Sequence, residues 1–199
     1  MTETPHRQSL SAAKKTLRQT ILRQRDALGP TARATASARI TRQILNLECF
    51  QRARSVLAYA SIGSEFDTHE LVSQVLTHKK LALPRVDKAT RSLQLYWVTN
   101  IALDLQAGIW GIREPRPDRC APAPLDEIDL VIAPGVAFTA RGDRLGYGGG
   151  YYDELLARIA PRPAVIAAAF ECQMVADLPM DASDLRVDGV VTENTCFTR

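Results

Sequence analysis

The alternation of short apolar runs with helical segments is the feature that most restricts the fold of this 199-residue chain. Such alternation predicts an α/β fold, with a mostly parallel central sheet flanked by helices in a Rossmann-like three-layer arrangement. Strands are expected at residues 55–61, 81–85, 93–98, 129–134, 164–170 and 186–192. Helices are expected at residues 10–28, 68–78 and 151–159, with a further helix after Gly29-Pro30.

The length and the distribution of apolar residues favour one domain over residues 1–199. Within it, an N-terminal helical pair at residues 9–47 is expected to pack on an α/β body at residues 54–199. Residues 113–124 hold four prolines, which predicts a surface excursion that is neither a helix nor a central strand. Neither flank of this segment has the pattern of an independent core.

Composition excludes several classes of protein. Hydrophobic residues make up 46% and charged residues 24%, as in ordinary globular proteins, and the net charge is only +3. The first residues, MTETPHRQSLSAAKK, lack the apolar core of a signal peptide, and no stretch has the length needed to cross a bilayer, so we expect a cytoplasmic protein without a membrane partner. The four cysteines form no CxxC pair and no metal-type cluster with the three histidines, which predicts free thiols.

Four of the five residues from Gly146 to Gly150 are glycines, and the predicted helix begins directly after them. Free amides and the positive end of the helix dipole favour an anion there, and the absence of Cβ atoms lets a phosphate approach the backbone. A tight turn is the alternative, but so many glycines favour the phosphate site. Because Tyr151 follows the last glycine, the letters match neither GxxxxGK[ST] nor GxGxxG.

Cations for a phosphate would therefore come from other parts of the chain. Arg144 precedes the glycines, and helical spacing places Lys14, Arg18 and Arg25 within roughly 40° of one another, beside the apolar stripe of the first helix. The alternative for these side chains is that their apolar stems pack while their charged ends reach water. A shared phosphate explains the inward cations better.

Magnesium accompanies most bound nucleoside triphosphates and prefers carboxylate oxygens. Asp153 follows the glycines directly, and Asp188 lies in the last expected strand, so both are candidate ligands. Helix capping for Asp153 and a charge at a strand edge for Asp188 are the alternatives.

Four segments, RLGYGGGYYD, KKTLR, EFDT and VDGVVTE, resemble the 5-formyltetrahydrofolate cyclo-ligase family in their order along nearly the whole chain. The glycine-tyrosine motif is highly specific, whereas each other segment alone is weak. The resemblance implies an enzyme that uses ATP to convert 5-formyltetrahydrofolate into 5,10-methenyltetrahydrofolate, with magnesium present and with release of ADP and phosphate.

The resemblance also implies roles for individual residues. The implied ATP-binding residues are Lys14, Arg18, Arg144, Leu145, Gly146, Tyr147, Gly148, Gly149, Gly150, Tyr151 and Tyr152. The implied folate-binding residues are Ile62, Glu65, Asp67 and Trp110, with Tyr147, Gly148, Gly149, Gly150 and Tyr151 shared between the two substrates. Asp153 and Asp188 would hold the metal.

Some of these roles have alternatives. Asp67 and Glu70 also match the start of a helix, where Asp67 would be an N-cap, and Trp110 matches a core residue. Where many members of the family carry a histidine, this chain has Ser183 and Asp184, which affects a detail of the pocket.

The implied reaction needs no covalent protein nucleophile, because the formyl oxygen itself would attack the γ-phosphate. Cations and alignment would then supply the catalysis. Two other functions remain open, namely another small ATP-dependent phosphotransfer enzyme and a nucleic-acid-binding module. The small positive charge and the absence of an RNA-binding signature lead us to expect no nucleic-acid partner. We also expect the protein to be a monomer.

Overall fold

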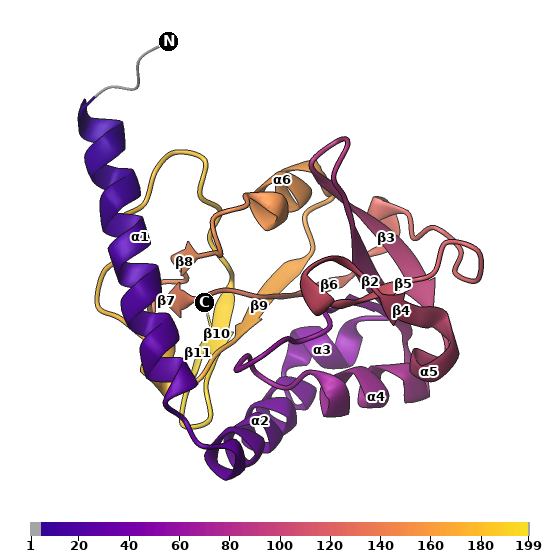
Figure 1. Cartoon of the computed structure of the whole chain (residues 1–199). Helices are drawn as coiled ribbons and strands as arrows, with labels where there is room; N and C mark the ends of the chain where they lie inside the picture. Colours follow the sequence, from indigo (N-terminus) through magenta and orange to yellow (C-terminus); the bar gives the residue numbers. More distant parts are fainter. Residues whose placement is uncertain (1–4, 199) are drawn as a thin grey trace.

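A seven-stranded sheet forms the centre of the protein (Figure 1). The computed structural model describes residues 5–198, without the side chains of residues 5–8 and of Trp110. The strand order is β11 (Cys196–Thr198), β10 (Gly189–Val191), β9 (Ala164–Ala168), β6 (Leu130–Ala133), β1 (Ser55–Leu57), β2 (Lys80–Asp87) and β3 (Ser92–Val98). The five strands from β10 to β2 are parallel, and the edge strands β3 and β11 are antiparallel to their neighbours. The predicted α/β class is confirmed.

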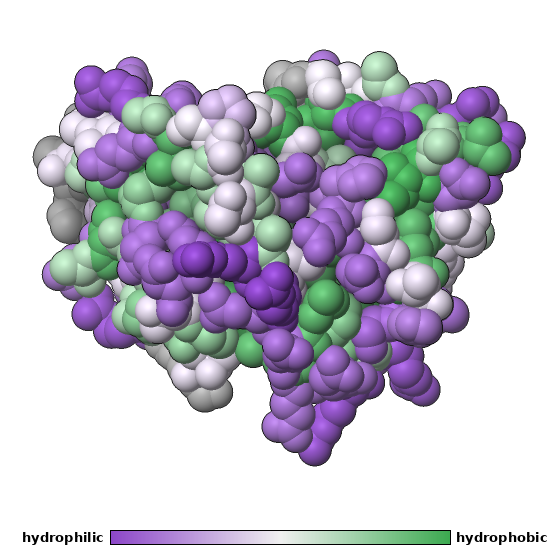
Figure 2. Space-filling model, turned by 90° about the horizontal axis from the view of Figure 1, so that it is seen from below, coloured by the Kyte–Doolittle hydropathy of each residue, from purple (hydrophilic) through white to green (hydrophobic). Residues whose placement is uncertain are grey.

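Helices cover both faces of the sheet (Figure 1). They are α1 (Pro5–Asp26), α2 (Pro30–Leu45), α3 (Glu48–Arg52), α4 (His69–His78), α5 (Ile101–Asp104) and α6 (Tyr151–Arg158), with short 3-10 turns at Ile109–Gly111, Leu125–Glu127 and Glu171–Gln173. Pro30 occupies the first turn of α2, where its fixed φ suits a helix start. Figure 2 looks at the face below α2, where hydrophilic residues surround smaller apolar areas.

Strand side chains alternate between two apolar cores. Val56 of β1 packs with α2, α3 and α4 on one face, whereas its neighbour Leu57 packs with α6 on the other. The same alternation runs through β6 and β9. Because both faces of the sheet are covered, these strands are continuous apolar runs in the sequence. The same apolar runs are the basis for predicting them as strands.

Residues 113–124 depart in part from the expectation of a surface excursion. The segment forms no helix and no central strand, but Arg113–Pro115 is a short strand, β5, which pairs with β4 (Leu105–Ala107). Pro122 bridges to Tyr96 of β3, and Cys120 and Ala123 are buried. The prolines end regular structure here, yet the segment closes one side of the core.

The N-terminal helix lies against the second small sheet, formed by β7 (Ala137–Phe138) and β8 (Arg144–Leu145) (Figure 1). Ile21 of α1 packs with Val136 and Leu145 in a third apolar cluster. This packing joins residues from opposite halves of the chain. In the described part of the chain, α1 and the other helices all fall short of the length and apolarity that a membrane span needs.

Candidate functional site

A cavity of about 1330 Å³ lies beyond the carboxyl ends of β1 and β6. From β1 the chain continues to β2 on one side of the sheet, and from β6 it continues to β9 on the other side. The strand order therefore reverses between the neighbouring strands β1 and β6. Ligands of open α/β sheets bind at such a point. The walls are α1, the loop of residues 146–150, the segments 59–65 and 182–185, and the β2–β3 hairpin.

The glycine loop forms the floor beside the start of α6, as the sequence predicted. Gly148 and Gly150 have φ values of 99° and 73°, a region that favours glycine. A Cβ on Gly149 would lie 2.8 Å from the ring of Tyr151. Within residues 5–198, the amides of residues 148–150 donate to no protein acceptor. They are therefore available to a ligand, although their binding to phosphate stays a prediction.

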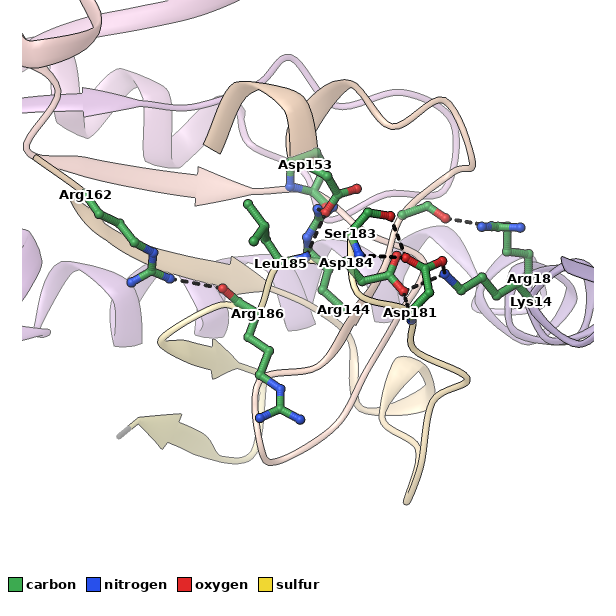
Figure 3. A network of polar contacts seen from close by, with 12 residues as sticks. Lys14, Arg18, Arg144, Asp153, Arg162, Asp181, Ser183, Asp184, Leu185 and Arg186 are labelled. Carbon is green, nitrogen blue, oxygen red and sulfur yellow. Dashed lines mark hydrogen bonds and ion pairs between the residues drawn. The ribbon is translucent and has the colours of Figure 1, made fainter. Parts of the chain in front are cut away.

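Lys14 points into the site from α1, as Figure 3 shows. It is only 8% exposed, and its Nζ lies 2.6 Å from Asp181 Oδ2 and 2.5 Å from Asp184 Oδ2. Burial lowers its pKa, but the hydrogen bonds that Lys14 donates to both carboxylates outweigh burial and leave the pKa raised. Lys14 is thus a charged, paired side chain at the cavity wall.

Arg18 lies one turn further along α1 and reaches the glycine loop directly. Its Nε donates to the carbonyl of Gly146 at 2.7 Å, and its guanidinium would lie 3.5 Å from a Cβ on Gly148. The helical face predicted to be basic therefore faces the cavity. Arg25, on the same face, is 5% exposed and also lines it.

The buried Arg144 and the half-buried Asp153 form an ion pair beside the loop (Figure 3). An Nη of Arg144 donates to Asp153 Oδ1 at 2.6 Å, and the amide of Leu185 donates to the same oxygen at 3.2 Å. Two polar atoms that line this region, Arg144 Nε and the Tyr152 hydroxyl, are buried without a partner in the described structure. Buried orphan donors of this kind suit a ligand with acceptor oxygens.

Glu65 and Ile62 line the cavity together with Tyr147 of the glycine loop. The Tyr147 hydroxyl donates to one carboxylate oxygen of Glu65, and the other accepts from the amide of Ile62 at 2.8 Å. Arg25 donates to that hydroxyl from α1. The prediction of site residues omitted Arg25, although its position on the helical face of Lys14 and Arg18 was a usable signal.

Three predicted residues lie elsewhere or outside the described atoms. Asp67 is absent from the described lining of the cavity, and its carboxylate accepts from the amide of His69 at 2.9 Å just before α4, whose N-cap residue is Thr68 rather than Asp67. Asp188 is likewise absent from that lining, and its carboxylate binds Arg162 at 2.8 Å and the amide of Val165 at 2.8 Å. The side chain of Trp110 lies outside the part that the structure describes.

A resident metal centre is not formed by the described side chains, which contain no group of three or more His, Cys, Asp or Glu residues placed to hold an ion. Asp153 fits a magnesium ion that arrives with a triphosphate, because such ions take one or two carboxylates and phosphate oxygens. Asp188 does not fit this role, since Arg162 and the amide of Val165 already occupy both of its oxygens.

The chain is similar to known proteins over most of its length. The sequence pattern of the 5-formyltetrahydrofolate cyclo-ligase family matches residues 10–193. The mitochondrial 5-formyltetrahydrofolate cyclo-ligase of Arabidopsis thaliana is 32% identical over 92% of this chain and 75% of its own length. The 5-formyltetrahydrofolate cyclo-ligase of Mus musculus is 27% identical over 94% of this chain and 97% of its own length.

Solved structures are similar as well. The 5,10-methenyltetrahydrofolate synthetase of Aquifex aeolicus superposes with a TM-score of 0.83 and 34% identity, covering 93% of this chain and 92% of its own. A 5,10-methenyltetrahydrofolate synthetase of Mycoplasma pneumoniae superposes with a TM-score of 0.71 at 20% identity, covering 90% of this chain and 98% of its own, which supports the fold alone.

Proposed function

The chain belongs to the 5-formyltetrahydrofolate cyclo-ligase family, and from this premise we propose that its cavity binds ATP and 5-formyltetrahydrofolate together and closes the folate to 5,10-methenyltetrahydrofolate. The observation that carries the proposal is the meeting of free loop amides with four basic side chains in one cavity. These side chains are Lys14, Arg18, Arg25 and Arg144. Cavities for one ligand measure roughly 300–1,000 Å³, so a volume of about 1330 Å³ is ample for two substrates.

In the proposed reaction, the formyl oxygen attacks the γ-phosphorus of ATP and ADP leaves. The neighbouring secondary amine of the folate then adds to the formyl carbon and loses its proton. The C–O bond breaks, and inorganic phosphate departs with the formyl oxygen. Phosphorylation is needed because a formamide oxygen is otherwise a poor leaving group.

The protein's contribution is orientation and charge. The loop amides and Arg18 would hold the phosphate chain, and Arg144 would stabilise the negative charge that develops on the transferred phosphoryl group. Its unpaired Nε leaves Arg144 a donor for that purpose. Asp153 would hold magnesium, which when bound neutralises phosphate charge.

The two other functions differ in what they require. A phosphotransfer enzyme with another acceptor would use the same loop, so the substrate must be tested directly. A nucleic-acid-binding module needs basic side chains on its surface, whereas Lys14 and Arg25 are buried at the cavity. We therefore favour the small-molecule substrates.

The test is to mix the purified protein with 5-formyltetrahydrofolate, magnesium and ATP and to follow the methenyl product by its ultraviolet absorbance. Product should form only with ATP, in equal amounts with ADP and phosphate. A parallel reaction without magnesium measures the need for the ion. Formation of ADP without methenyl product would instead indicate another phosphate acceptor and overturn the assignment.

A further inference from the structure

Glu114 of β5 is a buried carboxylate in the wall of the cavity that the proposed chemistry does not use. Its residue is 5% exposed, and it lies beside β2, where the amide of Val86 donates to its Oε1 at 3.3 Å. The side chain lines the cavity, yet within the described residues no Lys, Arg or His forms an ion pair with it. Buried acids are nearly always paired, so this one indicates a partner that arrives with a ligand.

The chain makes room for this carboxylate. A Cβ on Gly108 would lie 2.4 Å from Cδ and 2.5 Å from Oε2 of Glu114, so a side chain at position 108 would displace it. The conformation of Gly108 does not require glycine, since its φ is −112°. Glycine at position 108 is therefore explained by the space that the Glu114 carboxylate needs, and not by the backbone conformation at that position.

Several apolar residues line the cavity together with Glu114, namely Pro84, Val86, Leu93 and Ile112, and Arg91 lines it as well. A largely apolar lining that contains a buried carboxylate suits a flat ring whose polar edge meets that group. Of the two proposed substrates, the folate carries a 2-amino-4-oxo ring whose N3–H and 2-amino group are neighbouring donors. A carboxylate accepts such a pair of donors in a two-point contact.

We propose that Glu114 is a substrate-recognition residue, whose carboxylate accepts hydrogen bonds from the N3–H and the 2-amino group of the folate's pterin ring. The proposal rests on the proposed function. The glycine loop and the basic face of α1 would then hold the phosphates, and β5 would fix the ring at the far wall of the cavity.

Glu114→Gln tests the contact sharply. The amide keeps an oxygen for Val86 but presents its NH₂ to the ring's donors. Because hydrogen bonds to a charged group contribute about 1.5–3 kcal/mol, the KM for 5-formyltetrahydrofolate should rise about 10- to 100-fold. The KM for ATP should stay unchanged. The melting temperature should stay equal or rise, because an unpaired buried charge is removed.

Gly108→Ala is the second variant, since it displaces the carboxylate without removing it and should raise the same KM. Glu127→Gln is the matched control, because Glu127 lies on the surface and pairs with Lys80. Calorimetry with a 2-desamino analogue of the folate completes the design. Wild-type protein should bind the analogue about 10- to 100-fold more weakly than the folate, and Glu114→Gln should no longer bind the folate more tightly than the analogue.

The outcomes separate the two levels of the proposal. If wild-type protein makes no methenyl product, the proposed function fails. If it makes product but Glu114→Gln keeps the wild-type KM for the folate, or raises both KM values alike, the role of Glu114 is overturned. A lowered melting temperature with no change in discrimination against the analogue would make Glu114 a structural residue.

Discussion

The guanidinium of Arg25 donates to the hydroxyl of Tyr147 at 2.7 Å, across 122 positions of the chain. That hydroxyl donates onward to Glu65, and Arg25 Nε also donates to Ser64 at 3.0 Å. These bonds join α1, the glycine loop and the segment 62–65. The wall proposed for nucleotide and the wall proposed for folate thus share one hydrogen-bonded connection.

Tyr147→Phe should lower kcat/KM about tenfold, because Arg25 and Glu65 lose their shared partner and a hydrogen bond to a charged group contributes about 1.5–3 kcal/mol. Steady-state kinetics with each substrate varied in turn measures the effect. Tyr96→Phe is the control, since its hydroxyl bonds Gln94 outside this cavity. Unchanged kinetics in Tyr147→Phe would show that the connection has no role in turnover.

Lys14→Ala should raise the KM for ATP and also lower the melting temperature. The thermal effect follows because Asp181 and Asp184 lose a buried cationic partner. Because Lys14 is only 8% exposed, its removal should affect folding as well as phosphate binding. Lys15→Ala, on the exposed side of the same helix, should change neither quantity. A normal KM for ATP in Lys14→Ala would remove Lys14 from the phosphate site.

Asp181 should make stability depend on pH in acid. The hydrogen bond from Lys14, then those from Ser183, hold its pKa well below its ordinary value. A lowered folded-state pKa stabilises the protein above the unfolded value of about 4, and this contribution is lost as pH falls through the folded pKa. The melting temperature of wild type should therefore exceed that of Asp181→Asn at neutral pH. The gap should begin to narrow as pH falls below about 4 and should close as pH falls through the folded pKa; a constant gap would contradict the shift.

Asp153→Asn and Asp188→Asn should separate a metal ligand from a structural acid. Asp153→Asn should need more magnesium for half-maximal activity, because it weakens a carboxylate at the cavity. Asp188→Asn should leave the magnesium titration unchanged but lower the melting temperature, because its bonds to Arg162 and Val165 weaken. The reverse pattern would restore Asp188 as the ligand and exclude Asp153.

Gly148→Ala should impair ATP use. The φ of 99° is strained for a side chain at a cost of roughly 1–2 kcal/mol, and the new Cβ would meet Arg18. Gly29→Ala is the control, since its φ is −64° and a Cβ there meets nothing within 4 Å. Nucleotide titration by calorimetry should show weaker binding only in Gly148→Ala. Equal affinity in both variants would mean that the loop conformation is unimportant for the nucleotide.

Periodicity and local motifs in the sequence predicted much of the fold and part of the candidate site. The apolar runs placed β1, β6 and β9, and the spacing of Lys14 and Arg18 placed both on the helix face that lines the cavity. Local pattern could not give partners far along the chain, such as Asp181 for Lys14, 167 positions away. Local pattern also did not identify Glu114 as a site residue, because the prolines around it predicted a surface excursion and not the strand β5.

The packing of α1 on β7 and β8 has a consequence for synthesis of the chain. The cavity needs Arg18 from the first helix and Asp184 from the segment before β10, so it is not complete until almost all of this sequence has left the ribosome. Nucleotide and folate therefore cannot assist early folding intermediates. Ligand binding during translation would instead report that folding is complete.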